Sequence, residues 1–419
     1  MTRIRKLLSQ CGPGVISGAA NDDPSCIVTY SIAGASFGYL TLWTSIFALP
    51  LIAAVQLLCA RLGMVSGRGL AGAARTAWPA WIVVPLCALL AVANVVTLGA
   101  DLGGMAEVTE MVTGISAAAW TVVYTLALGS LLFKLSYGQI ERIFKWLTLV
   151  LFAYVFAGVL AKPDWGKVIE DSLVPRVEFS KQYLSTLVAI IGATVSPYFL
   201  FWQTSQEVEN EMCLGRKTVS ARRGASGDEF ERANVDVMAG STMSKLITYF
   251  ITITTAATLF THGKKEISTA RDAAAALGPV GGTAGTWLFA LGVIGTGLLA
   301  IPVLAGSCAY AWSEAFRWRA SLTEKPKRAA NFYIVLFLAM AVGLGLVWAG
   351  FRVIDMLFWA SVLNGLLAPV SLLAVVLLTS NPSVMAEHTS NNLLRSLGWA
   401  GFGLSAVAAI AMLIGFAGT

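Results

Sequence analysis

The sequence predicts an all-α protein that crosses a lipid bilayer eleven times. Hydrophobic residues make up 57% of the chain and charged residues only 12%, about half the share usual in soluble domains. The apolar runs are about 20 residues long and do not alternate with a period of two, which selects helices over a β-barrel. The 40 glycines suit close packing of helices within a membrane. The bilayer is therefore the solvent for most of this chain.

The expected spans follow the apolar runs in order. The first eight residues are short and basic, and no cleavage site follows them, so we expect them to be retained in a single membrane domain over 1–419. The third span is longer than a bilayer requires and is expected to tilt or to project. The spans are expected at 13–36, 40–63, 79–106, 116–136, 142–161, 183–203, 238–260, 284–312, 329–350, 354–379 and 396–417.

The basic residues predict the orientation of these spans. With the N-terminus in the cytoplasm, the inner segments hold most of the 29 lysines and arginines, which is the usual asymmetry of cytoplasmic loops. An odd number of spans then places the C-terminus outside a bacterial inner membrane. The same asymmetry explains the net charge of +6, so no nucleic-acid partner is expected. The charged segment 206–236 is interpreted as a solvated connector between two spans.

Residue types that hold metal cofactors are scarce. Six cysteines are scattered without C-x-x-C spacing, and the two histidines fall in expected loops. We therefore expect no disulfide framework, no zinc cluster and no cofactor. The sequence also contains no nucleophile–base pair and no cofactor motif, so an enzyme is not expected.

Two proline-containing breaks interrupt the first and sixth spans. The first, 21–25, carries Asp22 and Asp23 directly before Pro24, and the second lies at 193–197. Proline has no N–H and disfavours helix at the preceding residue, so backbone carbonyl and amide groups become free at membrane depth. Paired interrupted helices in two halves of a membrane protein are typical of the substrate site of a secondary transporter.

The positions of the breaks suggest two repeats of five helices. Spans one to five would form one repeat over 13–161, and spans six to ten a second over 183–379. The eleventh helix, 396–417, would be extra. Because each repeat has an odd number of spans, the second copy must be inverted in the membrane.

The breaks offer oxygen ligands to a hard cation. Carboxylates of Asp22 and Asp23 join freed backbone carbonyls, the donors that Mg²⁺ and Ca²⁺ prefer. The second break adds the carbonyl of Ala193 and the hydroxyls of Thr194 and Ser196.

Other polar residues within the spans are weaker candidates for a substrate or proton pathway. Asp101 could instead form a structural pair, Asn364 could bond a neighbouring helix, and Tyr198, like Tyr30, could serve in aromatic packing. Lys245 is expected to snorkel or to pair with an acid.

Several motifs together resemble the Nramp family of divalent-metal transporters. The resemblance is colinear over most of the chain and implies a LeuT-type fold, with an inverted five-plus-five repeat, one extra helix and alternating access. It implies a divalent metal ion as substrate, with Asp23 and the Ala193 carbonyl as ligands. The matching motifs are GPG at 12–14, DPSC at 23–26, AGASFGY at 33–39, ARLG at 60–63, GRGLA at 67–71, ADL at 100–102 and GATVSPY at 192–198.

Three departures from the family pattern bear on the metal. The asparagine ligand position is Cys26, the methionine ligand position is Ser196, and the histidine tied to proton movement is Tyr198. Oxygen ligands favour Mg²⁺, whereas a thioether favours softer transition metals. Tyrosine does not titrate near neutral pH, which argues against tight proton coupling. The changes resemble those of the magnesium-transporting relatives within the family.

Three functions remain open at this point. We favour a secondary transporter of hard divalent cations, Mg²⁺ before Mn²⁺, without proton coupling. The first alternative is a proton-coupled Mn²⁺ or Fe²⁺ importer in which Asp23 or Asp101 carries the proton. The second is of another class: a carrier of a non-metal solute, or a membrane sensor that has lost its metal site.

Overall fold

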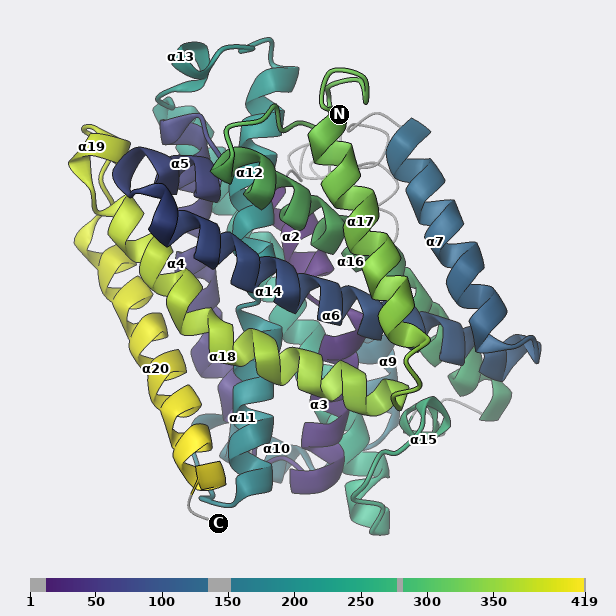
Figure 1. Ribbon diagram of the computed structural model, residues 1–419. Helices are drawn as coiled ribbons and strands as arrows, with labels where there is room; N and C mark the ends of the chain where they lie inside the picture. The colour runs from purple at the N-terminus through teal and green to yellow at the C-terminus, as the bar shows by residue number, and fades with distance from the viewer. Residues whose placement is uncertain (1–12, 135–151, 277–281, 418–419) are drawn as a thin grey trace, which may run out of the picture.

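The computed structural model describes residues 13–134, 152–276 and 282–417, and within these ranges the chain is helical with no β-strand. Helices lie side by side and cross obliquely, with α2 and α3 inside the bundle and α20 along one side (Figure 1). The elements are α2 Pro13–Ala20, α3 Pro24–Phe37, α4 Trp43–Ser66, α5 Leu70–Ala77, α6 Ala80–Thr113, α7 Ala117–Lys134, α9 Phe152–Leu160, α10 Trp165–Leu173, α11 Lys181–Thr194, α12 Pro197–Cys213, α13 Val219–Arg222, α14 Gly227–Thr258, η2 Phe260–His262, α15 Ala270–Ala275, α16 Gly282–Ala315, α17 Ala330–Val347, α18 Val353–Thr379, α19 Pro382–Met385 and α20 Asn392–Ala417.

Most of the expected spans are present as long helices. Nine helical segments of the described chain are long and apolar enough to cross a membrane, α11 and α12 together forming one of them. The expected first span is split into α2 and α3, as its proline break predicts. The helix α9 is the described part of the expected fifth span, whose residues 142–151 lie outside the described chain.

Two expected boundaries were wrong. The helix α6 continues to Thr113, so the third span is even longer than its apolar run suggested. The segment 206–236 is a solvated connector only in its middle, because α12 runs to Cys213, α14 begins at Gly227, and most residues between them are exposed. A capping box between Ser226 and Glu229 starts α14, and the acids of α12 within this segment are largely buried against neighbouring helices.

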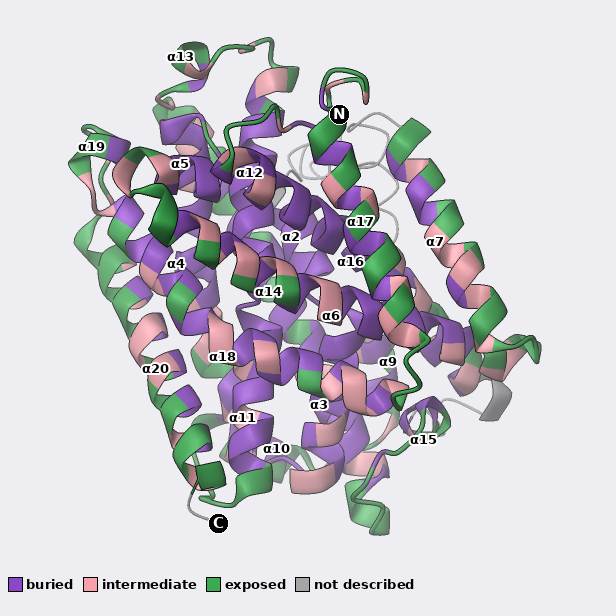
Figure 2. Ribbon diagram, viewed as in Figure 1, coloured by how far each residue is buried: buried purple, intermediate pink, exposed green. Residues whose placement is uncertain are grey.

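Burial separates an inner group of helices from an outer group. In the α11–α12 span, 89% of the most apolar stretch is buried, against 28% in α20. Figure 2 shows the same contrast, with buried residues along α2 and α11 and exposed residues along α7 and α20. The exposed residues of α20 are apolar, for example Val407 and Ile414, as expected for a face in contact with lipid.

The two broken helices run in opposite directions. The half-helix α2 contacts α12, and α3 contacts α11, so the first half of each broken helix lies beside the second half of the other. Figure 1 shows α2 and α12 in the upper part of the bundle and α3 and α11 below them. This antiparallel arrangement is what an inverted repeat requires of its two first helices.

Glycines let the broken helices approach their neighbours closely. A Cβ atom on Gly192 would lie 1.9 Å from the Ser361 carbonyl oxygen, so α11 and α18 touch backbone to backbone. A Cβ atom on Gly18 would likewise lie 2.7 Å from the backbone of Gly240 in α14. Such contacts between small residues are the usual way in which membrane helices pack tightly.

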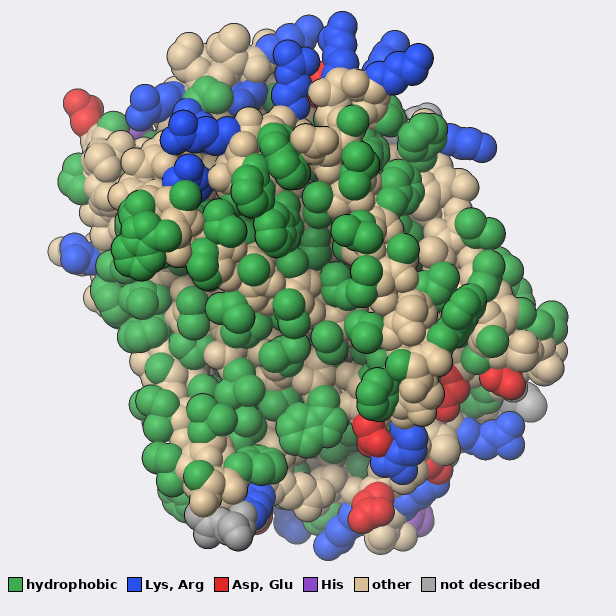
Figure 3. Space-filling model, in the orientation of Figure 1, with side chains coloured by type: hydrophobic (Ala, Val, Ile, Leu, Met, Phe, Trp, Pro, Cys, Tyr) green, Lys and Arg blue, Asp and Glu red, His purple; other side chains and the backbone are tan. Residues whose placement is uncertain are grey.

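The surface charge follows the long axis of the molecule. Hydrophobic side chains cover the middle of the face in Figure 3, and lysines and arginines gather at its upper end. At the lower end basic and acidic side chains are mixed. An apolar band between two polar ends is the expected surface of a membrane-embedded helical protein.

Candidate functional site

The first break separates α2 from α3 by three residues. The helix α2 ends at Ala20 and α3 begins at Pro24, with Asp23 in an extended conformation between them. The Asp23 carboxylate caps α3, because its Oδ1 accepts a hydrogen bond of 2.6 Å from the backbone N–H of Cys26. Asp23 is only 3% exposed, so its negative charge lies inside the protein.

The second break lies between α11 and α12. The helix α11 ends at Thr194, and α12 begins at Pro197, whose missing N–H suits the first position of a helix. The hydroxyl of Ser196 donates a hydrogen bond of 2.6 Å to the carbonyl oxygen of Gly192. Since the hydroxyl proton is used in that bond, the lone pairs of Ser196 Oγ stay available to a cation.

The side chain of Asn21 joins the two breaks. Its Nδ2 donates to the Ala193 carbonyl oxygen at 2.8 Å and to the Thr194 carbonyl oxygen at 3.1 Å. These carbonyls lie at the end of α11, where a helix leaves its last C=O groups without partners. Sequence reasoning placed Asn21 in the break but assigned it no role. The sequence signal that could have indicated a role for Asn21 was its position, because its amide directly precedes two acids within a break.

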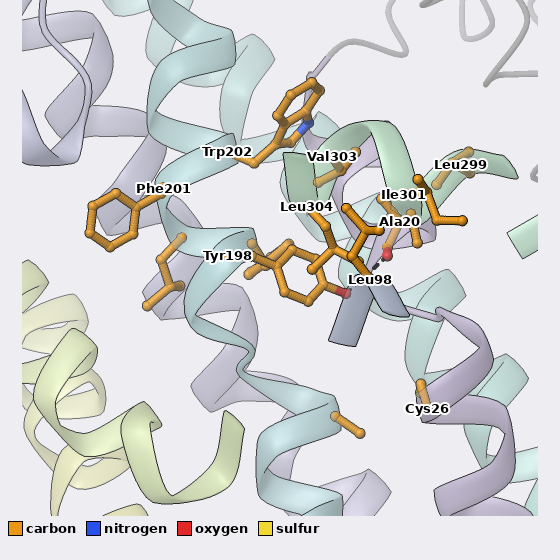
Figure 4. Packing of buried hydrophobic residues seen from close by; sticks show 14 of the residues in the cluster. Ala20, Cys26, Leu98, Tyr198, Phe201, Trp202, Leu299, Ile301, Val303 and Leu304 are labelled. Carbon is orange, nitrogen blue, oxygen red and sulfur yellow. Dashed lines mark hydrogen bonds between the residues drawn. The ribbon is translucent and has the colours of Figure 1, made fainter. Parts of the chain in front are cut away.

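Tyr198 holds the start of α12 against the first break. Its hydroxyl lies 2.9 Å from Asp23 Oδ2 and 3.2 Å from the carbonyl oxygen of Ala20. Figure 4 shows the ring among apolar side chains such as Leu98 and Leu304, with the hydroxyl directed toward Ala20. Tyr198 therefore packs in the core with its ring and donates a hydrogen bond to Asp23 with its hydroxyl.

Asp22 points toward α14 and Cys26. Its Oδ1 accepts a hydrogen bond of 2.6 Å from the hydroxyl of Ser244 and lies 3.9 Å from Cys26 Sγ. The Cys26 side chain thus faces an acid of the break, and Cys26 is fully buried. Asp22, Asp23 and Cys26 are together at the first break, as the sequence predicts.

Asp101 and Asn364 contact neighbouring helices near this region. Asp101 Oδ1 accepts from the backbone N–H of Ser25 at 3.0 Å and from its hydroxyl at 2.6 Å. The Nδ2 atom of Asn364 on α18 donates to the Thr97 hydroxyl on α6 at 3.0 Å. Asp101 is thereby tied to the start of α3, and Asn364 forms the interhelical bond that was its alternative role.

Lys245 lies inside the protein rather than at its surface. Its ammonium donates to Thr194 Oγ1 at 3.0 Å and to the Tyr30 hydroxyl at 3.2 Å. The residue is 4% exposed, so the expectation that it snorkels was wrong. In the described chain no carboxylate lies within the 4.0 Å that defines an ion pair with its nitrogen, so it forms no ion pair there. Its partners are hydroxyls because α14 places it opposite the end of α11.

Several buried oxygen atoms around the breaks accept no hydrogen bond from the protein groups that the structure describes. They include Asn21 Oδ1, Asp22 Oδ2 and Asp101 Oδ2, each on a residue no more than 1% exposed. A buried acceptor without a donor costs free energy, so such atoms mark places where a cation or water completes the structure. The carboxylate and amide oxygens here are hard donors.

The donors of this region differ from those of a metal-binding cluster of side chains. Within the described residues, no group of three or more His, Cys, Asp or Glu side chains is placed to hold a metal ion. The groups at the breaks that could contact a cation are backbone carbonyls and hydroxyls, together with one or two carboxylates. Such a mixed, oxygen-rich set allows the ion to keep some of its water.

A separate cavity of about 980 Å³ lies at the ends of α5, α12 and α16. Its acid Glu314 accepts from the backbone N–H groups of Gly69 and Gly72, so that carboxylate is occupied in holding the start of α5. A basic lining repels cations, so we do not assign the metal to this cavity. The basic residues that line it are Arg68, Arg75, Lys217, Arg222, Arg317, Arg319 and Arg328.

Comparison with protein-family models decides the family of this helical bundle with two breaks. Residues 14–415 match the model described as Natural resistance-associated macrophage protein-like, or Nramp. The chain belongs to the Nramp family. The resemblance drawn from the motifs of its broken spans is thereby confirmed over nearly the whole length.

Curated relatives of this Nramp chain carry the name divalent metal cation transporter MntH. One from Yersinia enterocolitica is 25% identical over 409 residues, covering 95% of this chain and 92% of the relative. Another, from Agrobacterium fabrum, is 28% identical over 286 residues, covering 67% of this chain and 60% of the relative.

Solved structures share the fold. A manganese transporter of Eremococcus coleocola, crystallised with an aromatic bis-isothiourea compound, superposes with a TM-score of 0.76 at 19% identity, covering 98% of this chain and 86% of the other. Mhp1, a nucleobase-cation-symport-1 family transporter in a closed conformation, gives 0.59 at 16% identity, covering 96% of this chain and 90% of the other. The all-helical, LeuT-type membrane fold expected for this Nramp chain is therefore confirmed.

Proposed function

We propose that this chain carries divalent metal cations across the bacterial plasma membrane by alternating access. Its membership of the Nramp family and its similarity to the divalent metal cation transporter MntH support divalent metal ions as the class of substrate. The observation that carries the proposal is the set of donor-free buried oxygens, Asn21 Oδ1, Asp22 Oδ2 and Asp101 Oδ2, gathered around two broken helices. No other feature of the described chain offers hard acceptors without donors at two helix breaks.

The proposed ligands come from both breaks. Asp23 supplies the anionic ligand, since a carboxylate whose oxygens accept from the Cys26 N–H and the Tyr198 hydroxyl still has lone pairs for a cation. Asp22 is a second ligand or holds a water of the ion. The Ala193 carbonyl and the Ser196 hydroxyl complete the protein's share, and Cys26 is a weaker candidate because its thiol faces Asp22. Thr194, Tyr198, Asp101 and Asn364 border the pathway.

Hard ions suit these ligands best, so we propose Mg²⁺ as the favoured substrate and Mn²⁺ as a second one. Ser196 offers oxygen where a thioether would favour softer metals. Two neighbouring carboxyl groups at the first break suit an ion that retains several waters. The Tyr198 hydroxyl donates a hydrogen bond to Asp23, and tyrosine does not lose its proton near neutral pH, so we propose transport without tight proton coupling.

Import of Mn²⁺ coupled to protons is the second candidate. It is supported by the similarity in fold to the manganese transporter of Eremococcus coleocola. In that function Asp101 would carry the proton, because one of its oxygens has no donor and its residue contacts the start of α3.

Transport requires the broken helices to move. Asp22 and Asp101 have no solvent exposure and Asp23 only 3%, so an ion cannot reach them in this closed arrangement. The half-helices are joined by extended backbone, which permits each half to tilt without breaking helical hydrogen bonds. We place the basic end of the molecule, with α5 and α13, in the cytoplasm, which puts the N-terminus inside and the C-terminus outside.

Uptake into proteoliposomes tests the proposal. Flux of Mg²⁺ and Mn²⁺ is measured for the wild type, for Asp23→Ala and for Asp355→Ala, a matched change at an exposed aspartate that pairs with Arg352. We expect Asp23→Ala to reduce flux at least about a hundredfold, because an anionic ligand is lost, and Asp355→Ala to resemble the wild type. Wild-type flux in Asp23→Ala would refute the assigned site.

The same vesicles separate the two candidates. A pH-sensitive dye inside the liposomes reports proton movement during metal uptake. Mg²⁺ flux without internal acidification is the expected result. Acidification that appears only with Mn²⁺ would instead establish the proton-coupled function.

A further inference from the structure

The helix α14 brings two consecutive polar residues to the two breaks. Ser244 donates to Asp22 at the first break at 2.6 Å, and Lys245 donates to Thr194 at the second break at 3.0 Å. Both residues are buried, Ser244 completely and Lys245 to within 4%. A buried ammonium is costly unless its surroundings replace the water that it has lost. The groups around the Lys245 ammonium therefore show what offsets the cost of burying its charge.

The surroundings of the ammonium resemble those of a bound monovalent cation. Lys245 Nζ has two hydroxyl oxygens near it, Thr194 Oγ1 at 3.0 Å and the Tyr30 hydroxyl at 3.2 Å, and it lies 5.4 Å from the centre of the Tyr30 ring. Thr194 is the last residue of α11, where the helix dipole is negative. Hydroxyls, an aromatic face and a helix C-terminus all favour a positive charge.

This position adjoins the ligands that we propose for the metal. Thr194 follows Ala193 directly, and both of their carbonyls accept from Asn21. A divalent ion held by Ala193 and the acids would lie in the electrostatic field of Lys245, with little water between them to screen the repulsion. The ammonium and the ion therefore compete for the same negative surroundings.

We infer that the Lys245 ammonium is a resident monovalent cation that offsets the buried acids of the empty carrier and weakens the hold of the site on a divalent ion. It replaces a cation that would otherwise have to enter from solution. The repulsion favours release, which a carrier needs as much as binding. This inference rests on the proposed function, since it assigns a residue that sets the affinity of the same site.

The geometry makes the charge removable without leaving unpaired groups. The Tyr30 hydroxyl and Thr194 Oγ1 lie 2.9 Å apart, so they keep each other as partners when the ammonium is lost. Lys245→Met preserves most of the apolar stem without the charge. Lys245→Gln also removes the charge but retains an N–H donor for the hydroxyls. Lys245→Arg keeps the charge and is the matched control.

The test is Mn²⁺ binding by titration calorimetry to the purified full-length protein, with melting temperatures recorded for every variant. We expect Lys245→Met and Lys245→Gln to bind Mn²⁺ at least about tenfold more tightly than the wild type, because a repelling charge is gone. Lys245→Arg should stay within about threefold of the wild type. A purely structural lysine would instead lower the melting temperature without tightening binding.

Folded neutral variants that bind no more tightly than the wild type overturn the inference. If neither neutral variant folds, a measurement on the wild type still tests the inference. Mn²⁺ affinity should not change when choline is replaced by Na⁺ or K⁺ at constant ionic strength, because the ammonium already fills the position. A marked dependence on the monovalent ion overturns the inference.

The outcomes separate this inference from the proposed function. Wild-type binding that the neutral variants leave unchanged refutes the role of Lys245 alone. If neither Mn²⁺ nor Mg²⁺ binds to the wild type or to any variant, the proposed metal site is refuted, and the role of Lys245 with it.

Discussion

Two regions of this protein bury carboxyl groups, and the regions differ in how many hydrogen-bond donors each carboxyl group meets. Near the end of α12, Glu209 accepts from the Tyr310 hydroxyl at 2.7 Å, from the Leu322 N–H at 2.7 Å and from the Ser321 hydroxyl at 3.0 Å. At the helix breaks, Asp22 and Asp101 each keep one oxygen with no donor. Both regions are inaccessible to solvent, so burial alone does not distinguish them.

We propose that this difference separates the acids of the candidate site from a structural acid. Glu209 is a connector, since its donors tie α12 to α16 and to the segment that follows α16. Asp22 and Asp101 are only partly satisfied by other groups of the described chain, and each has an oxygen that a cation could contact. Counting acids in a sequence therefore says less about a site than counting the donors that each acid meets in the fold.

Replacing an acid of the breaks is expected to have the largest effect. Asp22→Asn keeps an oxygen for the Ser244 hydroxyl but removes the negative charge. We expect Mn²⁺ affinity to fall about a hundredfold, as for the loss of an anionic ligand or of a group that holds its water. The melting temperature should not fall, because a buried charge with one donor-free oxygen is removed. Titration calorimetry and thermal unfolding measure the two quantities.

Asp355→Asn, at the exposed pair with Arg352, is the control and should change neither quantity. If Asp22→Asn bound Mn²⁺ as the wild type does, the contrast between the two regions would lose its functional meaning.

Replacing the connector acid is expected to give the opposite pattern. Glu209→Ala removes the carboxylate that accepts from the Leu322 N–H and the Ser321 hydroxyl, which should cost about 2 kcal/mol of unfolding free energy. Mn²⁺ affinity should stay within about threefold of the wild type. Glu209→Gln, which retains an acceptor oxygen, should destabilise the protein less. Loss of Mn²⁺ binding at an unchanged melting temperature would place Glu209 in the functional region instead.

A change of ligand type is expected to have the smallest effect. Ser196→Met restores a thioether in place of the hydroxyl that now bonds Gly192. We expect the affinity ratio of Mn²⁺ to Mg²⁺ to rise by about tenfold, because softer donors favour the transition metal. Competition between the two ions in the uptake assay measures this ratio.

Ser196→Ala is the matched control for that change. It should weaken the binding of both ions and leave their ratio near that of the wild type. A ratio unchanged in Ser196→Met would mean that position 196 does not face the ion.

The breaks themselves could be predicted because their causes are local. Pro24 and Pro197 remove an N–H and restrict the preceding residue wherever they occur, and the structure has its helix ends next to both. Asp23 at the cap of α3 follows from the same short segment. That Asp23 binds metal stays a prediction, which the uptake experiment tests.

The partners of the breaks could not be predicted because they come from distant parts of the chain. The bond from Ser244 to Asp22 spans 222 positions, and the bond from Asn21 to Ala193 spans 172. Sequence reasoning expected Lys245 to snorkel or to pair with an acid, and it treated the acids that follow Gln206 on α12 as solvated. Both expectations failed because a charge pattern does not reveal which face of a helix meets the core.

By itself, the sequence determined the membrane class, the positions of the two breaks and the resemblance to Nramp, since hydropathy and proline act through neighbouring residues. Only the tertiary structure decided that Asn21 bridges the breaks, that α14 supplies Ser244 and Lys245 to them, and that Glu209 is saturated. These contacts depend on how helices cross at their glycines, and no short stretch of chain encodes that geometry.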